Sequence, residues 1–216
     1  MLKFLSDDHW KSKYYYHGCG NVETLSKVLD SKKICTGREL GLKLEGGVAL
    51  FNGLDHISVC KKFSDSEYRI QRNNGRDAAF PRYISCKFGL ILSNNIKAKK
   101  TKIYIGNRYT ICEDIYKFVS KNPEKRWSDM FDEYQVEGSI GIDKFKAVFL
   151  PLYYIEQGYI TYEREYLLNI MKEINRYNLD IVDSCDYRFS ERYESPDYNR
   201  DEENSNIKMR IKRIIK

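Results

Sequence analysis

The chain has 216 residues, of which 42% are hydrophobic, and this composition excludes a wholly disordered chain. Its 37 Lys and Arg residues against 31 Asp and Glu residues give a net charge of +6, a mild basic excess that permits a nucleic-acid or acidic-protein partner without requiring one. No apolar run reaches the roughly 20 residues that cross a membrane, so we expect no membrane-spanning helix.

The cysteines and the N-terminal residues bear on the compartment. The six cysteines form no Cys-x-x-Cys pair, and because the chain has only three histidines we expect no metal site. Asp7 and Asp8 interrupt the N-terminal residues before a signal-peptide core can form. We therefore expect a cytoplasmic protein whose thiols are reduced.

The first predicted unit is a strand, a tight turn and a helix. A β-prone run of tyrosines at 14–16 ends at His17 and Gly18. Asn21 is suited to cap the helix that follows, which carries an apolar stripe that includes Leu25.

The middle of the chain is predicted to hold short strands separated by loops. The predicted strands cover residues 48–51, 56–60, 83–92 and 102–105. The glycine-rich stretch 36–53 is interpreted as a mobile loop and 64–80 as an exposed basic loop. Two short helices are predicted at 113–120 and around Trp127.

The last third is predicted to contain a hairpin and a long helix. Residues 133–142 and 147–150 form the predicted hairpin, and 161–177 is the clearest helix because its apolar residues recur on one face. The mixed charges of 186–206 indicate a poorly ordered linker, followed at 207–216 by a basic amphipathic helix.

Many short strands with interspersed helices favour the α+β class. We place one domain at residues 1–180 and a charged, flexible extension with a basic end at 181–216.

Two segments resemble signatures of the ADP-ribosyltransferase superfamily. The first is the strand that ends in Tyr16-His17-Gly18, before a helix that leads into Lys33-Ile34-Cys35-Thr36-Gly37. The second is the stretch 132–140 with its return strand at 145–148, which resembles the catalytic-glutamate strand, most closely that of toxins that modify DNA bases. Residues 57–60 lie where a middle element of the family is expected.

The resemblance implies a split β-sheet core with short helices and a C-terminal helix, and Glu133 as the catalytic carboxylate. Cleavage of the nicotinamide–ribose bond of NAD develops positive charge on the ribose, as in glycoside hydrolysis. A carboxylate fixed beside that sugar stabilises the charge. Glu137 is the alternative, because Gln135-x-Glu137 is similar to the pattern of toxins that modify proteins. Glu133 is preferred because it keeps the family spacing to the return strand.

Five further residues are implied to bind NAD, which is the substrate. The family implies that His17 bonds to the adenosine ribose and that Gly18 offers backbone groups to the nicotinamide amide. Tyr16 is a candidate to stack on the nicotinamide ring. Arg38 is a candidate for the pyrophosphate, and Ser58, in the middle element, for a further contact with NAD.

The predicted function is therefore an NAD-dependent mono-ADP-ribosyltransferase, of the kind found as toxins, effectors or phage-conflict enzymes. The acceptor is left open between a nucleic acid and a protein, and an antitoxin is left open as a partner. Arg69, Arg72 and Arg76, together with Glu137, are the candidate acceptor contacts. The alternatives are an NAD glycohydrolase on the same fold and an inactive domain that binds nucleic acid or a partner protein.

Overall fold

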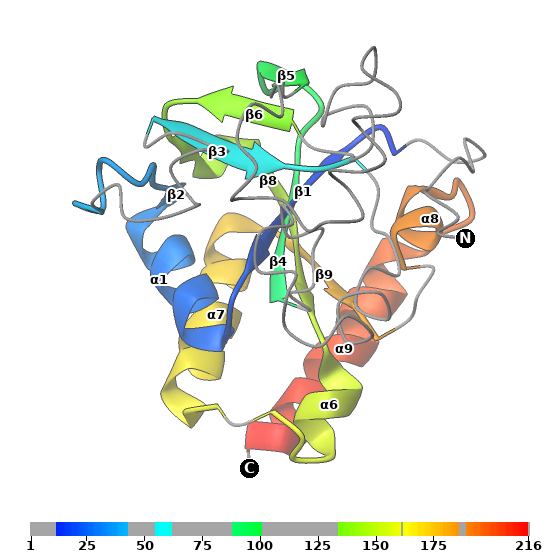
Figure 1. Cartoon of the computed structure of the whole chain (residues 1–216). Helices are drawn as coiled ribbons and strands as arrows, with labels where there is room; N and C mark the ends of the chain where they lie inside the picture. The colour runs from blue at the N-terminus through cyan, green and yellow to red at the C-terminus, as the bar shows by residue number, and fades with distance from the viewer. Residues whose placement is uncertain are drawn as a thin grey trace, which may run out of the picture.

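A computed structural model of the chain describes residues 12–42, 55–61, 88–100, 134–160, 162–185 and 189–215. These residues form a mixed α/β structure with several sheets and five α-helices, which agrees with the predicted α+β class at this coarse level (Figure 1). The elements predicted at 48–51, 102–105, 113–120 and around Trp127 lie outside the described residues, as does the basic loop at 64–80.

The largest sheet has four strands in the order β1-β4-β8-β9. β1 (Tyr15–Cys19) pairs antiparallel with β4 (Phe88–Leu92), and β4 pairs antiparallel with β8 (Phe145–Leu150). β9 (Asp180–Asp183) lies parallel to β8 and forms the other edge. The predicted strands at the start of the chain and within 83–92 are confirmed.

Two smaller sheets complete the β-structure. One has the order β3-β6-β5, formed by β3 (His56–Val59), β6 (Tyr134–Glu137) and β5 (Ala98–Lys100). The other pairs β2 (Lys33–Ile34) with β7 (Ile140–Gly141), which continues into the short 3-10 helix η3 (Ile142–Lys144). β3 confirms the strand predicted at 56–60.

An antiparallel bridge between Tyr16 and Cys60 links the two larger sheets. The Tyr16 N–H donates to the Cys60 carbonyl at 2.8 Å, and the Cys60 N–H donates back at 3.0 Å. Because Cys60 directly follows β3, the strands of the two sheets adjoin in the order β9-β8-β4-β1-β3-β6-β5.

The predicted hairpin of 133–142 and 147–150 is wrong. β6 pairs with β3 and β5, whereas β8 pairs with β4 and β9, so the two strands belong to different sheets. The chain turns at Gly138, whose φ of +75° suits glycine. The segment after this turn lies against the C-terminal end of α1, where the Ile142 N–H donates to the Lys32 carbonyl at 2.8 Å.

Two long helices cover one face of the largest sheet (Figure 1). α1 (Val22–Ser31) begins at Asn21, whose side-chain oxygen accepts a hydrogen bond from the Thr24 N–H at 2.8 Å, as predicted. α7 (Arg164–Tyr177) confirms the helix predicted at 161–177 and packs beside α1.

The C-terminal residues are part of the domain, which corrects the predicted flexible extension at 181–216. The boundary falls inside β9, and the chain continues into α8 (Phe189–Glu194) and α9 (Arg200–Ile215). Despite its many charges, α9 carries an isoleucine at every fourth position over its last turns. Ile207, Ile211 and Ile215 are all buried in the core.

Buried side chains gather on both faces of the largest sheet. The larger cluster includes residues from α1, α7, α9 and the short helix α6 (Leu152–Glu156). The smaller cluster, on the other face, contains Tyr16, Phe149 and Tyr193 of α8. Within the described ranges, no helix is long and apolar enough to cross a membrane.

Candidate functional site

His17 lies in the middle of β1 at the junction with β3. Its ring Nδ1 is 2.9 Å from the carbonyl oxygen of Ser58. A carbonyl only accepts hydrogen bonds, so Nδ1 carries the proton and donates, and in the neutral ring Nε2 is left as an acceptor. Burial lowers the pKa of His17, opposed by the bond to Ser58. The histidine is therefore a neutral imidazole held in one tautomer by the backbone of β3.

Because β3 pairs with β6, the start of β6, which directly follows Glu133 in the sequence, lies on the same side of β1 as β3. Val59 lies opposite Tyr134, and Glu133 directly precedes Tyr134 in the sequence. Strands in a sheet are about 4.8 Å apart, so the backbone of β6 lies two strands, or about 10 Å, from that of β1. Glu133 itself lies outside the described residues, and its role as the carboxylate stays a prediction.

A lysine and two tyrosines meet beside the same junction. The Tyr15 and Tyr134 rings are 5.5 Å apart and nearly perpendicular. Lys61 Nζ lies 4.9 Å from the centre of the Tyr15 ring and 5.9 Å from that of Tyr134, within the range of cation–π attraction. Sequence reasoning missed this group, because its members come from three separate segments and only the strand register brings them together. It adds a positive charge next to the predicted site.

The polar face of the β3-β6-β5 sheet carries two of the other candidates. Ser58 pairs with Gln135, and His56 pairs with Glu137, so each pair shares one face of the sheet. Ile57, between the two β3 residues, is buried on the opposite face. The Ser58 side chain is half-buried and Glu137 is exposed. Their contacts with NAD and acceptor stay predictions, whereas the Ser58 carbonyl already has a role in fixing His17.

The prediction that the Tyr16 ring stacks on nicotinamide is corrected. Tyr16 is 0% exposed, and its hydroxyl lies 3.0 Å from Glu194 Oε1 and 3.2 Å from Ser12 Oγ. Burial raises the pKa of this hydroxyl, so it stays protonated and donates to Glu194. The ring is a core side chain that ties β1 to α8, and no ligand reaches its face.

Arg38 is engaged by a carboxylate of its own chain. Its Nε and Nη2 atoms donate to the two oxygens of Asp55 at 2.5 and 2.9 Å. This bidentate bond lowers the pKa of Asp55. The Asp55 carbonyl also accepts from the Gly138 N–H at 2.9 Å, so the pair links the segment after β2 to the end of β6. Asp55 occupies two of the five N–H donors of Arg38, and the contact of Arg38 with the pyrophosphate stays a prediction.

Gly18 lies opposite Gly89 in the β1–β4 pair. A Cβ atom built on Gly89 would lie 2.1 Å from the carbonyl oxygen of His17 and 2.4 Å from Cζ of Phe149. Glycine at 89 therefore allows the backbone beside His17 to pack against the Phe149 ring. The backbone role predicted for Gly18 stays a prediction.

Arg69, Arg72 and Arg76 fall outside the described residues. Over the part of the chain that the structure describes, no three His, Cys, Asp or Glu side chains are grouped to hold a metal ion.

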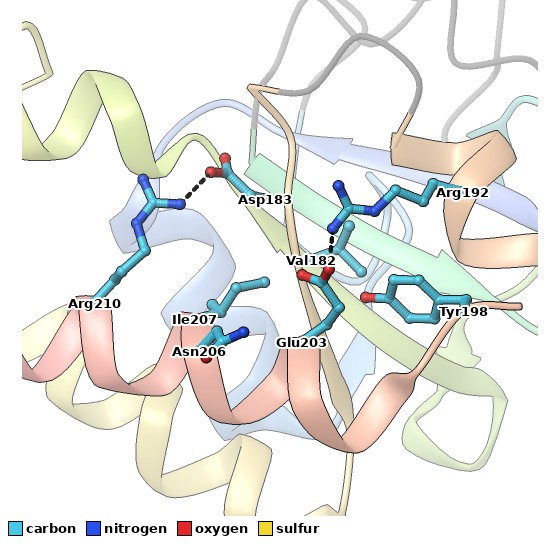
Figure 2. Close-up of a pocket in the computed structure, with 8 residues that line it drawn as sticks. All are labelled: Val182, Asp183, Arg192, Tyr198, Glu203, Asn206, Ile207 and Arg210. Carbon is cyan, nitrogen blue, oxygen red and sulfur yellow. Dashed lines mark hydrogen bonds and ion pairs between the residues drawn. The ribbon is translucent and has the colours of Figure 1, made fainter.

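A small pocket lies between β9, α8 and α9 (Figure 2), and His17 is not among the residues that line it. Its volume is about 160 Å³, well below the roughly 300 Å³ at which ligand pockets begin. Its two arginines are already paired, Arg192 with Glu203 and Arg210 with Asp183. We do not assign NAD to this pocket.

Comparisons with protein-family models, with curated proteins and with solved structures gave no match to this chain.

Proposed function

We propose that the chain is an NAD-dependent mono-ADP-ribosyltransferase whose NAD site lies at the junction of β1, β3 and β6. The observation that carries the proposal is the hydrogen bond from His17 Nδ1 to the Ser58 carbonyl, beside the strand that begins directly after Glu133. The strand that carries the histidine of one signature thus lies two strands from the strand of the other, although the two are more than a hundred residues apart in the sequence.

The proposed reaction needs little from the protein beyond orientation and one negative charge. The bond between the nicotinamide nitrogen and C1′ of the ribose breaks, and nicotinamide leaves with the electron pair. Glu133 stabilises the positive charge that develops on the ribose. A nucleophilic atom of the acceptor then bonds to C1′, and its proton passes to the Glu133 carboxylate.

His17 serves as a binding residue in this scheme. Because Nδ1 donates to Ser58, a neutral His17 offers Nε2 as an acceptor for a ribose hydroxyl. The lowered pKa keeps the ring neutral near pH 7, so the hydrogen bond retains this direction. Gly18 supplies backbone groups to the nicotinamide amide, and Lys61 supplies positive charge near the pyrophosphate.

Mass spectrometry of nucleic acid and protein incubated with NAD and the full chain tests the proposal. We expect one class of acceptor to gain the mass of ADP-ribose, with loss of the product in Glu133→Gln. The matched variant Glu137→Gln separates the two candidate carboxylates, and we expect it to retain cleavage of the nicotinamide–ribose bond, which Glu133→Gln loses. Free ADP-ribose formed without any acceptor would identify a glycohydrolase instead. Intact NAD with every acceptor would contradict the proposal.

A further inference from the structure

Three tyrosines form an exposed cluster at α6, far from the candidate NAD site. Tyr153 is 50% exposed and Tyr159 is 69% exposed, while Tyr154 between them is half-buried. Their ring centres are separated by 5.6 Å (153–154), 6.4 Å (153–159) and 6.2 Å (154–159). We call Tyr153, Tyr154 and Tyr159 the tyrosine cluster.

The backbone holds the cluster in place. Leu152 and Ile155 anchor α6 in the core, and the chain then turns at Gly158, which has a φ of +69°. The turn is closed by the Tyr159 N–H, which donates to the Tyr154 carbonyl at 2.9 Å. The exposed rings are therefore presented by a fixed turn, and ordering them on binding costs little conformational entropy.

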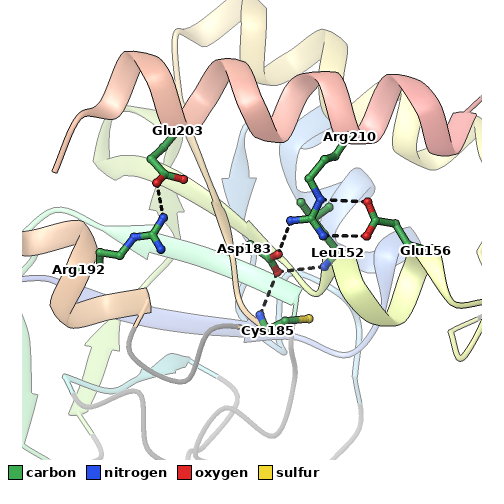
Figure 3. Close-up of polar contacts among 7 residues, drawn as sticks. All are labelled: Leu152, Glu156, Asp183, Cys185, Arg192, Glu203 and Arg210. Carbon is green, nitrogen blue, oxygen red and sulfur yellow. Dashed lines mark hydrogen bonds and ion pairs between the residues drawn. The ribbon is translucent and has the colours of Figure 1, made fainter.

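The basic end of α9 lies beside the tyrosine cluster. Figure 1 shows α6 next to the C-terminal part of α9, at the end of the molecule opposite β3 and β6. Arg210 Nε and Nη2 donate to the Glu156 carboxylate at 2.9 and 2.8 Å, which fixes α9 to α6 (Figure 3). Arg210, and after it Arg213, lowers the pKa of Glu156, so Arg213 also acts close to α6.

The charge of this surface is positive and only partly neutralised. No acidic residue occurs in the last ten residues of the chain, which include Lys208, Lys212 and Arg213. Glu156 is occupied by Arg210. Lys212 and Arg213 are exposed and form no ion pair with the residues that the structure describes. The surface thus places Arg213 near α6, the helix that carries the first exposed ring of the tyrosine cluster.

We propose that the tyrosine cluster and the basic end of α9 together bind single-stranded nucleic acid. Unpaired bases offer flat faces that stack on tyrosine rings, whereas bases inside a duplex do not, and the strand's phosphates meet Arg213. A second copy of this chain is a poorer occupant, because it would bring two basic helix ends together. The proposal stands apart from the NAD chemistry, since it shares no residue with that site.

Fluorescence anisotropy of a labelled oligothymidylate of about 20 nucleotides, at low salt, tests the proposal. We expect the wild type to bind. Tyr153→Ala with Tyr159→Ala should weaken binding at least about tenfold, because two stacking surfaces are removed. The matched control, Tyr153→Phe with Tyr159→Phe, keeps both ring faces and should bind as the wild type does.

The charge contribution has its own control. Arg213→Gln should reduce the slope of log K against log salt by about 0.7, since each phosphate contact on a single strand contributes about that much. Lys27→Gln removes the same charge from an exposed position elsewhere and should leave the slope nearly unchanged.

Three results would overturn the proposal. The first is absence of binding by the wild type at low salt, and the second is wild-type affinity in the double alanine variant. The third is a wild-type dimer in sedimentation analysis that the double alanine variant dissociates, which would make the cluster a protein interface. Glu133→Gln should bind the oligonucleotide normally while losing transfer, so failure of one proposal is distinguishable from failure of the other.

Discussion

The junction of β1, β3 and β6 differs from the C-terminal region of β9, α8 and α9 in how polar groups are used. Where α9 packs on α6 and β9, charged groups neutralise one another, as Arg210 does with Glu156 and Asp183. At the junction, His17 uses one ring nitrogen to bond the protein, and among the described residues no partner is found for the other. The difference indicates that the ion pairs of the C-terminal region stabilise the fold, whereas the junction, with one ring nitrogen of His17 unbonded among the described residues, is suited to bind a ligand.

The largest expected effect concerns the backbone beside His17. Gly89→Ala would push a Cβ atom against the His17 carbonyl and the Phe149 ring. We expect the free energy of unfolding to fall by about 3 kcal/mol, at the upper end for overpacking. Urea unfolding measures it. Gly20→Ala is the control, because a Cβ there meets nothing within 4 Å, and equal losses in both variants would contradict this packing.

Two arginines with bidentate carboxylate partners sharpen the comparison. Arg210 is 31% exposed and bonds to two acids, whereas Arg38 is 68% exposed and bonds to Asp55 alone. We expect Arg210→Ala to cost about 2 kcal/mol of unfolding free energy, a value reduced for partial exposure, and Arg38→Ala to cost less, because water screens its ion pair. Urea unfolding midpoints of the two variants test this order. A larger loss of stability in Arg38→Ala than in Arg210→Ala would contradict it.

A buried carboxylate on α7 offers a gain in stability. Glu173 is 1% exposed, and neither oxygen has a hydrogen-bond partner among the described residues, although Lys172 and Arg176 lie 3.7 Å away. Replacing this charge with an apolar side chain of similar length, Glu173→Met, should raise the free energy of unfolding by about 1 kcal/mol. Glu165→Gln, at an exposed position of the same helix, should change it little, and a marked loss in Glu173→Met would show that the carboxylate is needed.

The smallest effect is a pH dependence from His17. Its pKa in the folded chain lies below the unfolded value of about 6.5. As the pH falls, His17 therefore takes up its proton in the unfolded chain before the folded one. The free energy of unfolding is unaffected by His17 above pH 6.5 and decreases as the pH falls below that value. The slope from one group is at most about 1.4 kcal/mol per pH unit. His17→Gln should flatten the decline in urea stability between pH 6.5 and 5.5, and an unchanged decline would exclude this source.

Local signals in the sequence were enough for several elements. Asn21 and the apolar stripe of α1 are neighbours in the chain, so the helix and its first residue were predicted together. The pairing partners of β6 were not predicted. β3 and β5 come from earlier parts of the chain, and no local pattern encodes their pairing with β6. The isoleucines of α9 recur with helical spacing and lie in the helix predicted at 207–216, but the charges of 186–206, which include the first turns of α9, were interpreted as a linker.

The candidate site shows a similar limit. Neighbouring residues in a strand face opposite sides, so Tyr16 and His17 cannot both face one ligand, a conclusion that the predicted strand already contained. The salt bridge of Arg38 with Asp55 and the contact of Lys61 with Tyr134 depend on tertiary structure. The sequence motifs identified candidate residues at the junction, whereas the contacts of those residues follow from the pairing of strands that are distant in the sequence.

NMR of ¹⁵N-histidine-labelled protein, with and without NAD, tests the central claim most directly. Glu133→Gln is the sample for the NAD titration, so that the ligand is not consumed. We predict a His17 ring that carries its proton on Nδ1, titrates below pH 6.5 and shifts at Nε2 when NAD is added. A His17 signal that NAD leaves unchanged, while NAD binds elsewhere on the chain, would contradict the account.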